Sequence, residues 1–283
     1  MKSLNHAAAT STDFAAIPAQ QALSEAGMVE ERLPFTLRVV RNDAALKKAI
    51  TIRQAAYSRH VPEFAAKLGA PEDNDYARGS LVLLAESRMD GSPLGTMRIQ
   101  TNRFRELAVE SSVALPDWLQ NRSMAEATRL GVDFGRSGRL VKTALFKALY
   151  FYCLNAGIEW LVIGARSPLD RMYEGLLFQD LYPGQFIPLR HFDNIPHRVL
   201  AFDVAGARAK WEKAKHPLLN FMCYTHHPDI DLADINSSLG DVPLRSAALP
   251  AKVARSGLDN AIVSIRNTFR RTAELPGMVA VGA

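Results

Sequence analysis

Hydrophobic and polar residues alternate from Phe35 to Val40, and this period of two predicts a strand at the start of the ordered chain. Asn42 or Asp43 then provides a residue that can cap a helix. Apolar residues recur at helical spacing over the residues that follow, up to Tyr57. The first ordered elements are therefore expected to be a strand and an amphipathic helix.

The next segments have the pattern of a β-hairpin. Residues 80–85 form an apolar run typical of a buried strand, and Asp90-Gly91 supplies a turn signal. Residues 94–101 are expected to form the paired strand. Residues 123–132 are expected to form a further strand, which leads into a glycine-bearing turn.

Strands and helices alternate in the following part of the chain. A long helix is expected from about Leu140 to Asn155, where Ala156-Gly157 ends it. Residues 158–165 are a continuous apolar run and predict a strand. Pro168 is expected to begin a helix that reaches about Leu177, and residues 199–204 form the last clear strand.

This order of elements predicts an α/β (α+β) fold with a mixed, largely antiparallel central sheet flanked by helices. Residues 35–204 are expected to form that domain. Residues 1–34, rich in Ala, Ser, Thr and Gln, are expected to be a mobile leader. Residues 205–283 are expected to be a helical extension, in which the segment 252–272 is amphipathic with a basic face.

The composition narrows the class of protein. Hydrophobic residues make up 48% of the 283 residues, which is enough for a core. The net charge of +5 favours acidic partners, but the dense basic runs with interleaved aromatics of a nucleic-acid binder do not occur. Two cysteines, Cys153 and Cys223, make no disulfide framework. The sequence shows neither a secretory signal nor about 20 consecutive apolar residues, so a cytoplasmic location is expected.

Charged residues lie inside two of the predicted strands. Glu126, Thr128 and Arg129 belong to the strand 123–132, and Arg98 belongs to the strand before it. Regular alternation would put Glu126 and Thr128 on one face and Arg129 on the other, unless a bulge re-aims a side chain. Charges in a central strand are costly unless they are paired or functional. Spacing alone leaves a structural ion pair and a polar substrate pocket equally open.

Four motifs in order resemble the GNAT acyltransferase superfamily over roughly residues 36–204. They are a helix with an arginine and an aromatic residue, an acidic loop, a Gly-x-x-Arg strand and a strand that is similar to Glu-x-Ser-Arg, with Thr128 in place of Ser. In this sequence they read Ile52-Arg53-Gln54-Ala55-Ala56-Tyr57, Glu72-Asp73-Asn74-Asp75-Tyr76, Gly95-Thr96-Met97-Arg98 and Glu126-Ala127-Thr128-Arg129. The resemblance is closer to the branch that takes acyl groups from acyl carrier protein. That branch includes the acyl-homoserine-lactone synthases and the N-acyl amino acid synthases.

The resemblance implies an N-acyltransferase that moves a long-chain acyl group from an acyl-carrier-protein thioester to the amino group of an amino acid. No metal and no tightly bound cofactor are expected, and the partners are the carrier protein and the amino acid, with peripheral membrane contact through a lipid product. The implied catalytic residues are Glu126, Thr128 and Arg129. The implied substrate-binding residues are Arg53, Tyr57, Asp73, Asp75 and Arg98.

The turn before the long helix departs from the superfamily pattern. Acetyl-CoA enzymes carry Gln/Arg-x-x-Gly-x-Gly/Ala, whose amides hold a pyrophosphate at a helix N-terminus. Aligned on Gly138, this chain has Gly135 at the first position and Leu140 at the last, so two of three positions differ. This disfavours acyl-CoA as donor and favours a carrier-protein thioester. The basic residues expected to meet the phosphopantetheine phosphate or the acidic carrier surface are Arg136, Arg139 and Lys142.

A mechanism follows from these roles. The amine attacks the thioester carbonyl, and Glu126 accepts a proton from it, directly or through water. Backbone N–H groups of the same strand are expected to stabilise the oxyanion, and Arg98 and Arg129 to hold the acceptor carboxylate. An acyl chain needs an apolar cleft, and the candidates to line it, which also fit an ordinary core, are Leu145, Phe146, Leu149 and Leu161.

Other functions remain as alternatives. An acyl-homoserine-lactone synthase would usually have a Trp where this chain offers only Phe64. A CoA-dependent N-acetyltransferase and a non-catalytic module that binds lipid or carrier protein are the other two. His226-His227 has no further ligand at a metal-binding spacing, and His191 and His197 are interpreted as surface or loop-anchoring residues. Serine-hydrolase and Walker-type motifs do not occur.

Overall fold

The computed structural model describes residues 28–232, and the amphipathic segment 252–272 lies outside them. The main sheet has the strand order β11-β2-β3-β4-β5-β6-β9-β7, and β8 pairs with β9. Its strands are β2 (Phe35–Val39), β3 (Ser80–Ser87), β4 (Pro93–Thr101), β5 (Met124–Val132), β6 (Trp160–Ala165), β7 (Gln179–Asp180), β8 (Ile187–Leu189), β9 (Ile195–Asp203) and β11 (Ile230–Asp231). The helices are α1 (Asp43–Ser58), α2 (Pro62–Lys67), α3 (Asp73–Tyr76), α4 (Gly138–Asn155), α5 (Leu169–Gly175) and α6 (Ala207–Lys213).

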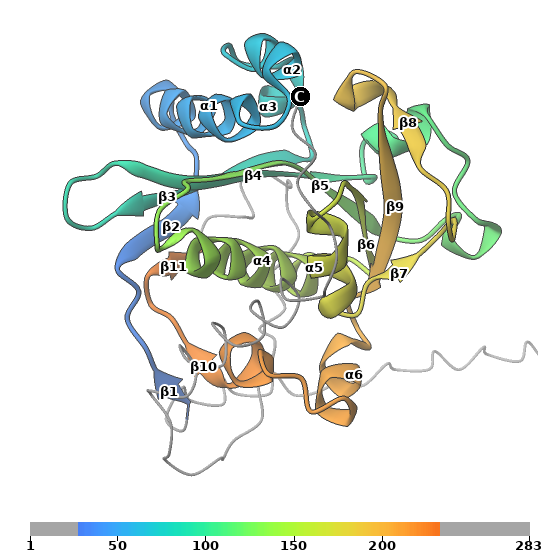
Figure 1. The fold of residues 1–283 in the computed structure, drawn as a ribbon. Helices are drawn as coiled ribbons and strands as arrows, with labels where there is room; N and C mark the ends of the chain where they lie inside the picture. The colour runs from blue at the N-terminus through green and yellow to red at the C-terminus, as the bar shows by residue number, and fades with distance from the viewer. Residues whose placement is uncertain (1–27, 233–283) are drawn as a thin grey trace, which may run out of the picture.

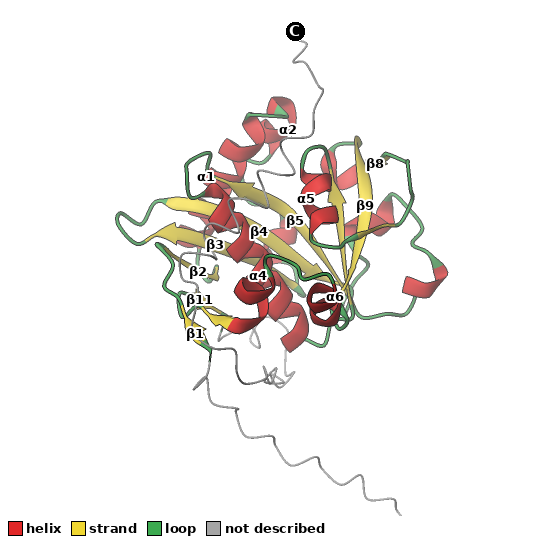
Figure 2. Ribbon diagram, turned by 60° about the horizontal axis from the view of Figure 1, so that its bottom comes forward, coloured by secondary structure: helices red, strands yellow, loops and turns green. Residues whose placement is uncertain are grey.

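Most neighbouring strands of the sheet are antiparallel, whereas β5 pairs with β6, and β11 with β2, in parallel. Helices α1 and α2 cover one face of the sheet, and α4 and α5 lie across the other (Figure 1; Figure 2). The predicted fold class, a mixed and largely antiparallel sheet flanked by helices, is confirmed. The predicted cap is confirmed as well, because Asn42 accepts a hydrogen bond from the amide of Ala45.

Alternation along β4 and β5 separates an apolar face from a polar one. Met97, Ile99, Ala125 and Ala127 point towards α4 and belong to the main hydrophobic core. The residues between them face α1 and carry the polar side chains. Gly95 brings β4 close to α4, because a Cβ atom there would lie 2.5 Å from Cγ1 of Val141.

The core also decides the role of the four residues considered for an acyl cleft. Leu145, Phe146, Leu149 and Leu161 are all buried in the main core cluster. Phe146 packs against the rings of Phe178, Phe202 and Trp211. These residues therefore serve as core in this structure. Within residues 28–232, no helix combines the length and the apolar character needed to cross a bilayer.

Strands β5 and β6 pair over part of their length only. Their register runs from Met124 opposite Trp160 to Ala127 opposite Ile163. Beyond that point β5 continues to Val132, while β6 continues in its pairing with β9. The two strands thus diverge at the level of Thr128, and the chain enters α4 soon after β5 ends (Figure 1).

Ordered structure extends beyond both expected domain limits. Strand β1 (Val29–Glu30) pairs in parallel with β10 (Thr225–His226), and Leu33 is buried. Strand β11 joins the main sheet beside β2, so residues 205–232 are helical only in part. The Nζ atom of Lys147, in α4, donates to the carbonyls of Phe221 and Thr225 at 2.7 and 2.5 Å.

Candidate active site

A β-bulge in β5 brings Arg129 to the polar face of the sheet. Arg98 lies opposite Thr128, but Thr96 lies opposite Gly131, so β5 has one more residue than β4 between these pairs. Arg129 takes up the extra residue with a φ of 55°, in the left-handed region that few non-glycine residues adopt. Regular alternation would have turned Arg129 towards α4. The bulge puts it on the same face as Thr128, beside α1 and α2.

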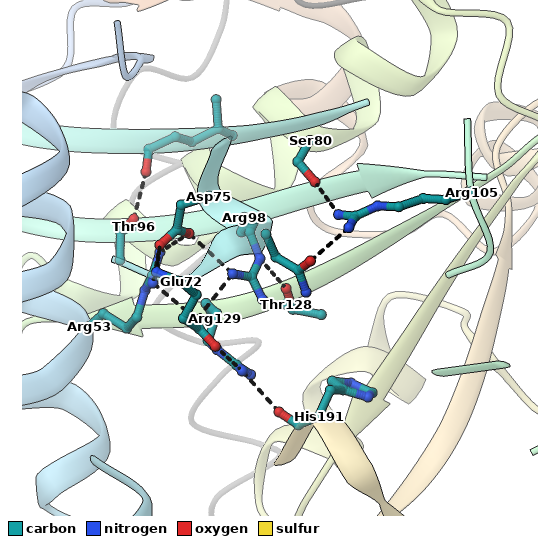
Figure 3. A network of polar contacts seen from close by, with 12 residues as sticks. Arg53, Glu72, Asp75, Ser80, Thr96, Arg98, Arg105, Thr128, Arg129 and His191 are labelled. Atoms are coloured by element: carbon teal, nitrogen blue, oxygen red, sulfur yellow. Dashed lines mark hydrogen bonds and ion pairs between the residues drawn. The ribbon is translucent and has the colours of Figure 1, made fainter. Parts of the chain in front are cut away.

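Three arginines and two carboxylates converge on this face (Figure 3). Arg129 donates from Nε and Nη2 to the two oxygens of Glu72, at 2.7 and 2.6 Å. Arg98 donates from Nη1 to Glu72 and Asp75, at 3.0 and 3.1 Å. Arg53 holds both oxygens of Asp75, at 3.0 and 2.9 Å. We call these five residues the arginine–carboxylate cluster.

The cluster is buried and carries an excess of positive charge. The side chains of Arg53, Arg98 and Arg129 are at most 4% exposed, whereas that of Glu72 is 24% exposed. Three guanidinium groups face two carboxylates, so one positive charge is left over. Two donors, Nε of Arg53 and Nη1 of Arg129, are buried without a partner. The cluster can therefore accept one further anionic group.

Proton binding at the cluster follows from its ion pairs. Burial opposes the charged form of Glu72, but the hydrogen bonds and the charge of Arg129 outweigh it and hold the pKa of Glu72 below its ordinary value. Arg53 lowers the pKa of Asp75 against burial in the same way. Conversely, the bonds to Glu72 raise the pKa of Arg129, although burial opposes this. Both carboxylates are thus ionised at neutral pH.

These shifts make the folded protein sensitive to acid. A carboxylate with a depressed pKa in the folded state contributes stability above its ordinary pKa, and that contribution is lost as the pH falls. We expect the free energy of unfolding to decrease below about pH 4.5, the ordinary value for Glu72. Urea unfolding between pH 7 and pH 3 measures this. Glu72→Gln should flatten the pH dependence, and an equal slope in this variant would contradict the assignment.

Glu126 and Thr128 lie beside the cluster, on the same face of β5. Oγ1 of Thr128 accepts a hydrogen bond from Nε of Arg98 at 3.2 Å. The side chain of Glu126 is fully buried, and its Oε2 accepts from the amide of Val109 at 3.1 Å. Its Oε1 lies 3.1 Å from Nε2 of His191. Two segments, one with Val109 and one with His191, thus contact the carboxylate of Glu126, which stays outside the ion pairs of the arginines.

Of the two residues expected from the acidic loop, Asp75 belongs to the cluster and Asp73 does not. Asp73 is exposed, and Glu72 and Asp75 supply the carboxylates of the cluster. Glu72 precedes α3, and its amide donates to the side chain of Asp75 at 2.9 Å in a capping box. The Glu-x-x-Asp spacing at a helix start is the sequence signal for this pair. Asp73 is therefore replaced by Glu72 in the set of cluster residues.

Aromatic side chains close the site around Arg129. The guanidinium carbon of Arg129 lies 5.1 Å from the ring centre of Phe64 and 5.3 Å from that of Phe192. Tyr57 packs edge-on against Phe64, and burial raises the pKa of its phenol despite the nearby Arg129. Sequence patterns did not indicate Phe192, because its contact comes from a chain segment far from the motifs.

His191 is buried, so it is not the surface residue that was one of its two interpretations. Its side chain is 8% exposed and contacts Glu126. Its backbone carbonyl accepts a hydrogen bond from Nη2 of Arg129 at 2.9 Å. The contact depends on the loop before β9 folding over β5, which no local pattern indicates.

The three basic residues assigned to the carrier lie apart from the cluster, at the start of α4. Arg136 and Arg139 are exposed, and burial together with Arg139 lowers the pKa of the half-buried Lys142. Phe134, next to them in sequence, is 86% exposed, and the guanidinium of Arg59 lies 5.8 Å from its ring centre. This surface, which we call the α4 basic surface, joins positive charge to one exposed aromatic ring.

Solved structures with a similar fold are known. FeeM, an N-acyl amino acid synthase from uncultured soil microbes, has a TM-score of 0.51 and 20% identity, and the match covers 64% of this chain and 96% of that one. The CoA-dependent acyl-homoserine lactone synthase BjaI gives a TM-score of 0.46 and 14% identity, over 72% of this chain and 98% of that one. At such identity the likeness to FeeM establishes the fold. No family model matches the sequence, and no curated protein matches it.

Proposed function

We propose that this protein is an N-acyltransferase that joins a long-chain acyl group, carried as a thioester on an acyl carrier protein, to the amino group of an amino acid. The observation that carries the proposal is a buried carboxylate, Glu126, beside an arginine cluster with one positive charge in excess. A free amino acid presents an amine next to a carboxylate. The cluster would hold the carboxylate, and Glu126 would receive the proton of the amine.

The acceptor carboxylate fits the unpartnered donor of Arg129. Nη1 of Arg129 is buried and has no partner, while the other nitrogens of this guanidinium are fixed by Glu72 and by the carbonyl of His191. An arginine held in this way is pre-organised for a carboxylate. An amine without a carboxylate cannot bind Arg129 in this way, so an amino acid is favoured over a simple amine.

In the chemical step, the place where β5 and β6 diverge would leave backbone N–H groups of β5 available to the reacting carbonyl. The amine nitrogen forms a bond to the thioester carbonyl carbon, the C–S bond breaks, and the thiolate of the carrier leaves. The amine loses a proton to Glu126, directly or through water. Glu126 then passes this proton to the leaving thiolate. Backbone N–H groups of β5 beyond Ala127, where its pairing with β6 ends, would stabilise the oxyanion.

The α4 basic surface supports a carrier protein as donor. Arg136, Arg139 and Lys142 present positive charge at the start of α4, and Phe134 adds an exposed apolar contact. A carrier of acidic surface would be steered by these charges, and the attraction would weaken with salt. The departure of the loop from the phosphate-binding glycine pattern also favours the carrier over free acyl-CoA.

The double variant Arg136→Glu/Arg139→Glu tests the donor. We expect KM for the acyl carrier protein to rise about 10-fold or more, because like charges then oppose docking, with KM for the amino acid unchanged. The difference from the wild type should shrink at high salt. Arg78→Glu, at an exposed site elsewhere on the chain, is the control of equal charge change per residue. An unchanged KM for the carrier would show that the α4 basic surface does not bind the donor.

The main experiment is a reconstitution. The purified protein is incubated with acylated carrier protein and a mixture of the common amino acids, and products are identified by mass spectrometry. An N-acyl amino acid is the expected product. A lactone that appears only with S-adenosylmethionine would indicate an autoinducer synthase, and a product formed only from acyl-CoA would exclude the carrier as donor. Donor binding without any product would indicate a binding module.

A further inference from the structure

We propose that His191 is a positioning residue for the reaction and holds the carboxylate of Glu126 towards the acceptor amine. The inference rests on the proposed function, in which Glu126 receives the proton. It assigns a role to a side chain that belongs to none of the sequence motifs. His191 belongs to a short 3₁₀ helix, Arg190–Phe192, in the loop between β8 and β9.

The contact with Glu126 is direct and buried. Nε2 of His191 lies 3.1 Å from Oε1 of Glu126, and their side chains are 8% and 0% exposed. Oε2 of Glu126 is occupied by the amide of Val109, so the two oxygens of the carboxylate have separate holders. Nε2 and Oε1 are in ion-pair contact but lack hydrogen-bond alignment, and neither atom has another hydrogen-bond partner. In the proposed arrangement Nε2 carries a hydrogen, since two facing lone pairs would repel, and a small rotation of the ring directs it to Oε1. The contact fixes which way the carboxylate plane is turned.

Neighbouring groups hold the imidazole ring in this orientation. The ring of His191 lies 4.4 Å from that of Phe192, centre to centre, and Phe192 stacks at 4.3 Å on the ring of His197. Burial lowers the pKa of His197 to about 4, so that ring is neutral and acts through packing. Nη2 of Arg129 also fixes this loop, by donating a hydrogen bond to the backbone carbonyl of His191.

The backbone carbonyl and the side chain of His191 therefore contact different parts of the site. Its carbonyl belongs to the surroundings of Arg129, where the acceptor carboxylate is expected. Its ring belongs to the surroundings of Glu126. A substitution at 191 removes the ring and keeps the carbonyl, so the two contributions can be separated by kinetics.

The test compares two amide substitutions. In His191→Gln the amide nitrogen lies as many bonds from Cβ as Nε2 does, so the donor to Glu126 is retained. In His191→Asn it lies one bond nearer to the backbone, and the donor is lost. We expect kcat to fall about 10- to 100-fold in His191→Asn and to stay within about threefold in His191→Gln. KM for the amino acid should be unchanged in both, because the carbonyl remains.

His197→Asn is the matched control, since His197, in β9, packs on Phe192 of the loop and the asparagine can keep the hydrogen bond to the carbonyl of Ile195. It removes the stacking on Phe192 but leaves the contact between His191 and Glu126 in place, so kcat should fall far less than in His191→Asn. Equal losses in His191→Gln and His191→Asn would overturn the proposal. So would a loss confined to KM, which would indicate that His191 only shapes the loop.

A measurement without substrate separates this inference from the proposed function. In the wild type, the Nε2 proton of His191 should give an exchange-protected, downfield NMR signal. In Glu126→Gln it should move upfield, because the single amide oxygen is taken by the amide of Val109 and the NH2 group offers His191 no acceptor. If the wild type forms no N-acyl product, the proposed function fails and this signal still decides whether His191 holds Glu126. A signal that does not change in Glu126→Gln refutes the contact.

Discussion

Glu126→Gln is expected to lower kcat roughly 100- to 10,000-fold, the range in which a general base contributes to catalysis. The amide has the shape of the carboxylate but does not accept the proton of the attacking amine. Its oxygen can still accept the hydrogen bond from the amide of Val109, so the fold around β5 should persist. KM for the amino acid should change little, because Glu126 lies outside the ion pairs that involve the arginines.

Steady-state kinetics with acylated carrier protein measures this effect, with thermal unfolding as a check on the fold. Glu110→Gln is the matched control. Glu110 lies in the same segment as Val109, and its carboxylate likewise accepts a hydrogen bond from a backbone amide, that of Leu107. This variant should retain the activity of the wild type. A wild-type kcat in Glu126→Gln would exclude Glu126 as the base and leave acyl transfer without its proposed proton acceptor.

Asp75→Ala is expected to cause the largest loss of stability, about 3 to 5 kcal/mol. Its carboxylate accepts from Arg53 and Arg98, and it also accepts from the amide of Glu72. Removing it leaves three buried guanidiniums to share Glu72, the one remaining carboxylate of the cluster. Buried charge that loses its partner costs far more than the pair gains over an apolar replacement.

Asp73→Ala is the control for this loss, two positions earlier on the same short helix. Asp73 is exposed, so its replacement should change the free energy of unfolding by no more than about 0.5 kcal/mol. Urea unfolding of both variants at pH 7 gives the comparison. Equal losses would mean that the charge of the loop matters and the individual ion pairs do not.

Much of the fold was readable from periodicity. The apolar run of β3, its turn at Asp90-Gly91 and the helical spacing of α1 each reflect a local rule, and all appear in the structure. Short elements such as α2, β7 and β8 were not predicted, because they span too few residues to show a period. The pairing of β11 with the main sheet was not predicted, for a related reason. Strand β11 contains two residues, and only its pairing with β2 defines it.

For the site, the sequence determined which residue types were present and on which predicted elements they lay. Arg98, Glu126 and Arg129 were identified because charges inside strands are costly and conspicuous. The tertiary structure decided which of them meet. The bulge turned Arg129 onto the face of Thr128, the capping box brought Glu72 in place of Asp73, and the loop before β9 placed His191 on Glu126. Periodicity records only neighbours along the chain, whereas a bulge and a loop that folds over a strand depend on residues distant in sequence, and those fix the geometry of the site.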